Sequence, residues 1–258
     1  MVKETFTRRD FVISATKVLA VGILAPASTL PAARRISALE TTQQTPVPQL
    51  WRGKEWSFLI DIEKCIGCAN CVGACKKENG VPLDQEVYRT WVERYLVDSN
   101  EKVRVDSPGG GLNFRQLDIK SEKQFFVPKL CNQCHNAPCI QVCPVGATYK
   151  TGDGVVLVDR KRCIGCRYCI QACPYGARFL HPILKVADKC TWCYHRISKG
   201  MLPVCVQVCP TGARKFGNLK DPDSEVATLK KKARTRVLKP DMGTKPNLYY
   251  LGLDEVVK

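Results

Sequence analysis

Sixteen cysteines constrain this 258-residue chain more than any other feature of its sequence. They form four motifs, I to IV. Motifs I and III have the spacing C-x2-C-x2-C-x3-C, and in motifs II and IV the second gap widens to four and eleven residues. The motifs are, in order, Cys65, Cys68, Cys71 and Cys75; Cys131, Cys134, Cys139 and Cys143; Cys163, Cys166, Cys169 and Cys173; and Cys190, Cys193, Cys205 and Cys209. Three thiolates on one loop can bind one face of an iron-sulfur cubane, and the last cysteine can bind a neighbouring cluster. The sequence therefore predicts four 4Fe-4S clusters.

The motifs also repeat one another outside the cysteines. Residues 61–75 (DIEKCIGCANCVGAC) align with 159–173 (DRKRCIGCRYCIQAC), which indicates an internal duplication. The last parts of motifs II, III and IV are near-copies: CIQVCPVGA, CIQACPYGA and CVQVCPTGA. A proline follows the last cysteine in these three motifs, whereas Lys76 stands there in motif I. We expect a different turn after motif I, with no ligand lost.

Other uses of the cysteines fit this pattern poorly. A disulfide framework has no reason to repeat one tight local spacing, and four cysteines on one loop are too crowded for a tetrahedral zinc ion. His135 and His195 lie beside ligand positions, but sixteen cysteines already satisfy four clusters. We expect Trp192, between Cys190 and Cys193, to pack around a cluster.

The sequence contains no pattern for a substrate site of its own. It has no G-x-G-x-x-G, no P-loop and no nucleophile elbow, and no cluster lacks a cysteine that would leave an iron open for catalysis. We therefore expect an electron-transfer protein without a small-molecule substrate, and not an enzyme.

The net charge of +16 suggests nucleic-acid binding at first sight. Four oxidised clusters with their thiolates would lower it to roughly +8, and loss of residues 1–35 would lower it further, to roughly +4. We therefore expect no nucleic-acid partner. The basic run LKKKARTRVLK (229–239) is interpreted as a solvated helix face or a docking patch for a partner or anionic lipid.

Residues 1–35 resemble a Tat export signal, because the twin arginine Arg8-Arg9 precedes Phe11 and a moderately apolar stretch to about residue 30. An ordinary amphipathic helix is the alternative. Clusters are inserted before export, so a route for folded cargo fits the motifs. The expected location is the periplasm or the extracytoplasmic face of the membrane. Residues 36–55, polar and containing prolines, are expected to form a linker.

Short strand-like runs precede three of the motifs, at 57–62, 124–128 and 155–159, which predicts an α+β fold. Residues 76–130 form the largest insertion, and Pro108-Gly109-Gly110-Gly111 within it indicates a surface excursion. Spacing alone leaves the grouping of motifs open, since II could pair with III, or III with IV.

The segments CNQCHNAPCIQVCPVGA, CTWCYHR, LPVCVQVCPTGAR and VLKPDMGTKPNLYYLGLD resemble the iron-sulfur subunits of membrane-associated respiratory molybdoenzymes. The similar types are tetrathionate and polysulfide/thiosulfate reductases, with related nitrite-reductase and sulfite-reduction iron-sulfur proteins. The resemblance implies two ferredoxin-like dicluster modules. One would comprise 56–75 with 186–215 and the other 131–185, with the insertion at 76–130 and a C-terminal tail at 216–258.

The same resemblance implies which cysteines share a cluster. The last cysteine of motif IV would complete the cluster of motif I, and the last cysteine of motif I would complete that of motif IV. Motifs II and III would exchange their last cysteines in the same way. The sets are Cys65, Cys68, Cys71 and Cys209; Cys190, Cys193, Cys205 and Cys75; Cys131, Cys134, Cys139 and Cys173; and Cys163, Cys166, Cys169 and Cys143.

The resemblance also implies the partners. Electrons would pass through the four clusters between an integral membrane quinone-reactive subunit and a molybdopterin-containing catalytic subunit. The alternative is a periplasmic hydrogenase, a multihaem cytochrome or a sulfite-reduction membrane complex as the electron-transfer partner.

Overall fold

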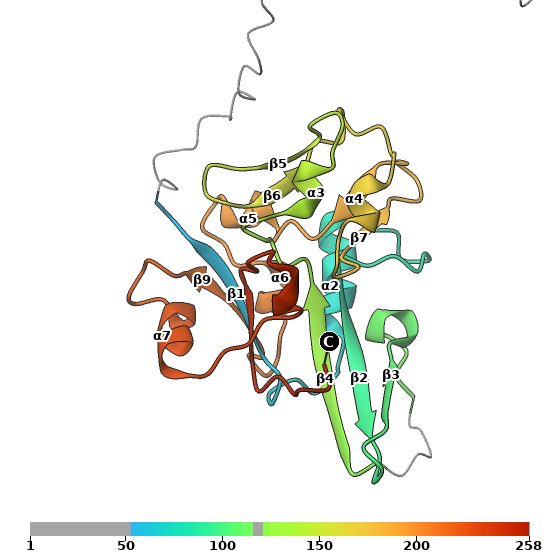
Figure 1. The fold of residues 1–258 in the computed structure, drawn as a ribbon, viewed down its shortest axis with the longest axis vertical. Coiled ribbons are helices and arrows are strands. Elements are labelled where there is room, and N and C mark those ends of the chain that lie inside the picture. Colours follow the sequence, from blue (N-terminus) through green and yellow to red (C-terminus); the bar gives the residue numbers. More distant parts are fainter. Residues whose placement is uncertain (1–52, 116–120, 258) are drawn as a thin grey trace, which may run out of the picture. The chain divides into compact units, whose positions relative to one another are not determined.

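The computed structural model describes residues 53–115 and 121–257 (Figure 1). The predicted export signal and nearly all of the predicted linker lie outside these residues. The described part mixes short helices with small sheets, so the predicted α+β class is confirmed. None of the helices in the described part of the chain is both long and apolar enough to span a bilayer.

Most elements are short. The strands are β1 (Trp56–Asp61), β2 (Thr90–Val97), β3 (Val103–Asp106), β4 (Lys123–Leu130), β5 (Thr148–Lys150), β6 (Val156–Val158), β7 (Arg178–Leu180), β8 (Ala187–Lys189), β9 (Arg214–Asn218) and β10 (Leu248–Leu251). The helices are α2 (Asn70–Asn79), α3 (Pro138–Gln141), α4 (Tyr168–Gln171), α5 (Tyr194–Ile197), α6 (Val204–Gln207) and α7 (Glu225–Lys232), with 3-10 turns η2 (Pro108–Gly111) and η3 (Pro240–Met242). The strands predicted at 57–62, 124–128 and 155–159 are confirmed as β1, β4 and β6.

Strand β1 forms the centre of a sheet that joins distant parts of the chain. It pairs antiparallel with β9, which follows motif IV (Figure 1), and parallel with β10 from the C-terminal tail. Phe58 lies opposite Phe216 on one side and Leu248 on the other, and both Phe58 and Leu248 are fully buried. The sheet therefore brings motifs I and IV together and includes part of the tail.

The predicted insertion forms a second sheet of its own, in the order β3-β2-β4, with antiparallel pairing throughout. Val92 and Val127 are buried on it. The predicted surface excursion at 108–111 differs from the structure, because Gly110 and Gly111 are buried. A side chain at Gly111 would meet Val92 of β2 at 3.0 Å. The proline and glycines correctly predicted a turn at this place, but they carry no information about which other residues pack against it.

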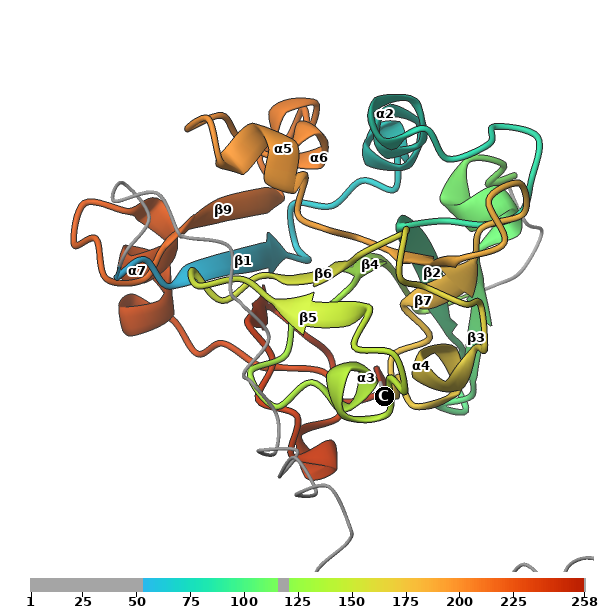
Figure 2. The ribbon, with the colours of Figure 1, turned by 90° about the horizontal axis from the view of Figure 1, so that it is seen from above.

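The helices of the four motifs pack in two pairs. Figure 2 shows α2 beside α6, which joins motifs I and IV, and α3 beside α4, which joins motifs II and III. Two antiparallel hairpins, β5-β6 and β7-β8, connect motif II to III and motif III to IV. The strand pairs alone thus link motif III to both motif II and motif IV. The helix contacts, by contrast, group motif II with motif III.

Motif I ends differently from the other three, as Lys76 predicts. Proline cannot continue a helix, so α3, α4 and α6 stop before Cys-Pro. With Lys76 after Cys75, α2 continues to Asn79 and ends at Gly80, whose backbone is left-handed. The Lys76 ammonium is buried and donates a hydrogen bond to the Gln85 carbonyl at 2.6 Å, so it anchors the start of the insertion.

Replacing Gly165 with alanine is expected to destabilise motif III far more than replacing Gly176. Both glycines have a left-handed backbone (φ 71° and 61°), where a Cβ costs about 1–2 kcal/mol. A Cβ at Gly165 would also lie 2.5 Å from the Lys185 carbonyl oxygen, whereas nothing lies within 4 Å of one at Gly176. Thermal unfolding and iron content of both variants test this, and equal losses would contradict it.

Candidate iron-sulfur sites

The first cysteine site is a cavity lined by thiols from two motifs. Cys65, Cys68 and Cys71 of motif I line it together with Cys209 of motif IV. Cys65 and Cys68 lie in the loop between β1 and α2, and Cys71 lies in the first turn of α2. The other lining residues include Val92, Pro128 and Arg214. The structure therefore gathers, in one apolar cavity, the four cysteines of the first predicted set.

A second cavity combines motifs II and III in the same manner. Cys131, Cys134 and Cys139 line it with Cys173. Tyr175 and Arg178 also line this cavity. The Tyr175 hydroxyl lies 2.5 Å from the hydroxyl of Thr244, so the C-terminal tail also contributes to its surroundings.

The third predicted set, Cys75 with Cys190, Cys193 and Cys205, is buried throughout. Burial raises the pKa of Cys75, and the nearby thiols of Cys190, Cys205 and Cys193 raise it further. The Asn79 amide lies 3.5 Å from the Cys75 sulfur and 3.7 Å from the Cys193 sulfur, and it can donate to both. These contacts bring Cys75 of motif I to the cysteines of motif IV.

The fourth predicted set is Cys143 with Cys163, Cys166 and Cys169. Cys169 belongs to a buried apolar cluster with Cys134 and Cys139, and Cys163 packs against that cluster. Backbone N–H groups donate to two of the sulfurs, from Ala147 to Cys143 at 3.2 Å and from Ala187 to Cys163 at 3.3 Å. The structure thus places Cys163 and Cys169 of motif III against cysteines of motif II.

Burial makes seven of these sixteen thiols harder to ionise. Burial raises the pKa of Cys65 to about 11 and the pKa values of Cys134 and Cys190 to about 12. Burial also acts to raise the pKa of Cys143 and of Cys209, but hydrogen bonds, mainly from backbone N–H groups, outweigh it and lower both values. Iron binds the thiolate, so the cation must supply the stabilisation that the buried site withholds.

Buried cationic groups with unused donors face these cavities. Nη2 of Arg178 and Nη1 of Arg214 are buried and have no hydrogen-bond partner among the described residues. A buried donor without a partner is costly, and an anionic group in the cavity would satisfy it. The described residues contain no set of three His, Cys, Asp or Glu side chains that would hold a single metal ion. Four separated thiols, apolar walls and unpaired guanidinium donors fit an anionic iron-sulfur cubane, whose thiolates each bind a different iron.

Comparison with known proteins agrees with this chemistry. Residues 122–219, which contain motifs II to IV, match the family model of a 4Fe-4S dicluster domain. A tetrathionate reductase subunit of Salmonella typhimurium is 43% identical over 202 residues, which cover 78% of this chain and 73% of the relative. The corresponding tetrathionate reductase subunit of Archaeoglobus fulgidus is 44% identical, covering 79% and 85%. A selenate reductase subunit of Mesobacillus selenatarsenatis is 34% identical, covering 96% and 99%.

The chain belongs to the ferredoxin-type iron-sulfur subunits of reductase complexes. The predicted resemblance is thereby confirmed. Proteins of this family transfer electrons and are not the catalytic subunits of their complexes, and the same holds for this chain.

The two histidines and the tryptophan that flank ligand positions of this iron-sulfur subunit lie in different surroundings, and the packing of Trp192 around a cluster stays a prediction. His135 and His195 are exposed, and His195 Nε2 lies 2.7 Å from a Glu78 carboxylate oxygen. Trp192 is 2% exposed, and its ring packs against Phe58 and Phe216. The two histidines are therefore surface groups, and the tryptophan is part of the core.

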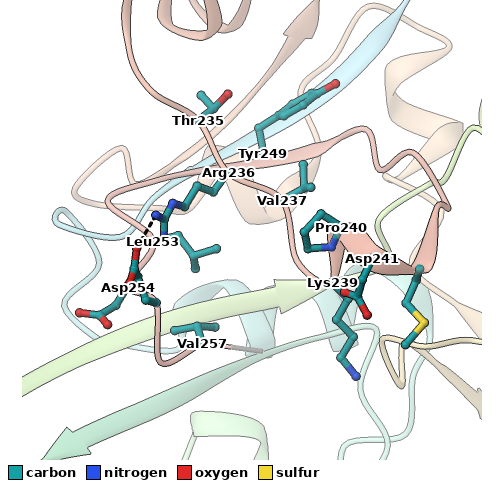
Figure 3. A pocket seen from close by; sticks show the side chains of 12 residues that line it. Thr235, Arg236, Val237, Lys239, Pro240, Asp241, Tyr249, Leu253, Asp254 and Val257 are labelled. Carbon is teal, nitrogen blue, oxygen red and sulfur yellow. Dashed lines mark hydrogen bonds and ion pairs between the residues drawn. The ribbon is translucent and has the colours of Figure 1, made fainter. Parts of the chain in front are cut away.

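A further cavity of the iron-sulfur subunit lies in the C-terminal tail and contains no cysteine. Thr235, Val237 and Tyr249 are among its lining residues, and an Arg236–Glu255 ion pair of 2.8 Å lies beside it (Figure 3). The predicted basic run at 229–239 crosses this region. It is divided between the end of α7 and a segment that hydrogen-bonds β10, since Arg236 N donates to the Tyr250 carbonyl at 2.9 Å.

Sequence reasoning missed the two cavity arginines. Arg178 and Arg214 each follow the last cysteine of their motif by five residues, in CPYGAR and CPTGAR. That repeat was a usable signal, but nothing in it distinguishes a buried guanidinium from an exposed one.

Proposed function

We propose that this subunit binds four 4Fe-4S clusters through the exchanged cysteine sets given above. The observation that carries the proposal is the composition of the two cavities. Cys209 completes the cavity of motif I, and Cys173 completes that of motif II. Each cavity thus combines three cysteines of one motif with the last cysteine of another, as cluster exchange in ferredoxins requires.

We also propose the corresponding modules, 56–75 with 186–215 and 131–185, with 76–130 inserted between the halves of the first and 216–258 as the tail. The packing of α2 on α6 and of α3 on α4 supports this division. Between the modules, Gln133 is fully buried. Its amide donates to the Cys190 carbonyl at 2.9 Å, and its side-chain oxygen accepts from Val156 N at 2.7 Å.

The burial of the cysteines supports one order of electron transfer. Each 4Fe-4S cluster accepts and releases one electron. Cys68 and Cys166 are exposed, which favours the motif I and motif III sites as the two ends. Cys131 and Cys190 are buried, and Cys131 lies close enough to raise the pKa of Cys190. The proposed order is therefore motif I, IV, II and III, with the protein excluding water from the two middle sites.

We propose that electrons pass between an integral membrane quinone-reactive subunit and a molybdopterin-containing catalytic subunit. The names of the relatives, subunits of tetrathionate and selenate reductases, support a place in a multi-subunit reductase. The twin arginine supports export by the Tat route to the periplasm or the extracytoplasmic membrane face.

Iron analysis tests the central claim. Protein purified without oxygen is expected to contain about sixteen iron atoms and as many acid-labile sulfides per chain, four for each cubane. About eight would contradict the four-cluster proposal. Purification from its own membranes is expected to retain a large molybdenum-containing subunit and a membrane subunit, and recovery of neither would contradict the proposed partners.

A further inference from the structure

Two arginines occupy equivalent places in the two proposed modules. Arg214 is the first residue of β9 after motif IV, and Arg178 is the first residue of β7 after motif III. Motif II has Thr148 at the same place in the repeat. One arginine per module is therefore built into the repeat.

Both guanidinium groups are buried and held by a threonine. Arg214 is 2% exposed and donates to the Thr90 hydroxyl at 2.9 Å, and Arg178 is 4% exposed and donates to the Thr148 hydroxyl at 3.3 Å. One nitrogen of each has no hydrogen-bond partner, and no described carboxylate forms an ion pair with either. A buried unpaired cation is costly, so the apoprotein alone gives no reason for these two charges.

The cysteines around Arg214 belong to both proposed clusters of its module. Arg214 lines the cavity of Cys65 and Cys71, and Cys205 of the neighbouring set also lies close to it. A guanidinium keeps its proton throughout the pH range of proteins, so Arg214 stays charged beside both cysteine sets.

Arg178 has the matching surroundings in the second module. It lines the cavity of Cys131 and Cys139, and Cys169 of the neighbouring set also lies close to it. Like Arg214, it stays charged beside both cysteine sets of its module.

We propose that Arg214 and Arg178 are positioning residues that each hold one fixed positive charge between the two clusters of a module and raise the reduction potentials of those two clusters only. This inference rests on the proposed four clusters. Reduction adds one electron, and so one negative charge, to a cluster. A neighbouring cation stabilises that charge, and the guanidinium neither gives up nor accepts a proton. The electron comes from one redox partner and leaves to the other.

Redox titration of the cluster-loaded protein, followed by EPR, tests this assignment. Arg214→Gln is expected to weaken reduction of two of the four clusters at least about tenfold, a potential about 59 mV lower for one electron. Arg178→Gln is expected to shift the other two. Arg214→Lys and Arg178→Lys keep the charge and are expected to shift the potentials much less than the Gln variants.

Arg94→Gln is the matched control, because Arg94 is also buried but pairs with Asp106 at 2.6 Å and lines neither cysteine cavity. It is expected to lower stability and leave all four potentials unchanged. Equal shifts of all four clusters in one Gln variant, or no shift in either, would overturn the inference.

Loss of clusters in the Gln variants is also decisive. If only the Lys variants keep about sixteen irons, the charge is needed to retain the clusters, which supports the inference. If the Lys variants lose clusters as well, a role of the charge is overturned. Fewer than sixteen irons in the unsubstituted protein would instead refute the proposed function, before any variant is compared.

Discussion

Replacing Cys173 with alanine is expected to remove the cluster bound by the first three cysteines of motif II. The cluster bound by the first three cysteines of motif III is expected to remain, although Cys173 itself lies in motif III. Cys173 lines the cavity of Cys131, Cys134 and Cys139, and burial together with the nearby Cys131 raises the pKa of its thiol. The variant is expected to contain about twelve irons per chain, because one cubane of four is lost.

Alkylation identifies which cluster is missing. Thiolates bound to iron are protected from iodoacetamide, whereas the cysteines of an empty site react once the site opens. Peptide mapping of Cys173→Ala is expected to find Cys131, Cys134 and Cys139 modified. Modification of Cys163, Cys166 and Cys169 instead would contradict the exchange.

Cys143→Ala is the matched control for this prediction. It removes the last cysteine of motif II, so the exchange predicts loss of the motif III cluster and protection of Cys131, Cys134 and Cys139. If the cysteines were used within their own motifs, the two variants would show the opposite patterns. The pair therefore distinguishes the two arrangements without any assignment of EPR signals.

Local sequence patterns predicted the local parts of this fold. The strand-like runs became β1, β4 and β6, and the proline after the last cysteine marks where three helices end. These features depend on neighbouring residues alone, since the proline removes a backbone donor and fixes φ wherever it stands. The different end of motif I was predictable for the same reason, because Lys76 stands where the other motifs have proline.

Features that depend on distant residues were not predictable. β10 pairs with β1, and Phe58 lies opposite Leu248. Arg214, which follows motif IV, donates a hydrogen bond to Thr90 of the insertion. No local pattern marks either contact, because tertiary packing decides both. The grouping of motifs needed the family resemblance, since the β7-β8 hairpin also joins motif III to motif IV.

Replacing Arg89 with leucine is expected to destabilise the protein strongly, by about 3–5 kcal/mol, as is typical when one partner of a buried ion pair is lost. The Arg89 side chain is 6% exposed and that of Asp188 is 5% exposed, and their nearest atoms are 2.8 Å apart. The pair joins the predicted insertion to β8, just before motif IV. Asp188 would remain buried, and among the described residues only the half-exposed Arg160, at 3.4 Å, would be left as a cationic partner.

Loss of the visible cluster absorbance in guanidinium, followed without oxygen, measures this effect as a lower midpoint. Arg236→Leu is the control, since it breaks the Arg236–Glu255 pair, whose glutamate is largely exposed, and it is expected to leave the midpoint nearly unchanged. An equal shift in both variants would contradict the prediction.

The double variant Arg89→Leu/Asp188→Leu separates the cost of an unpaired charge from the loss of attraction. Two apolar side chains leave no buried charge, so most of the stability is expected to return. Full recovery is not expected, because Arg89 also donates to the Asn79 side-chain oxygen at 2.8 Å. That contact orients the amide that faces the Cys75 and Cys193 sulfurs. A double variant as unstable as Arg89→Leu would mean that Arg89 acts through Asn79 and not through Asp188.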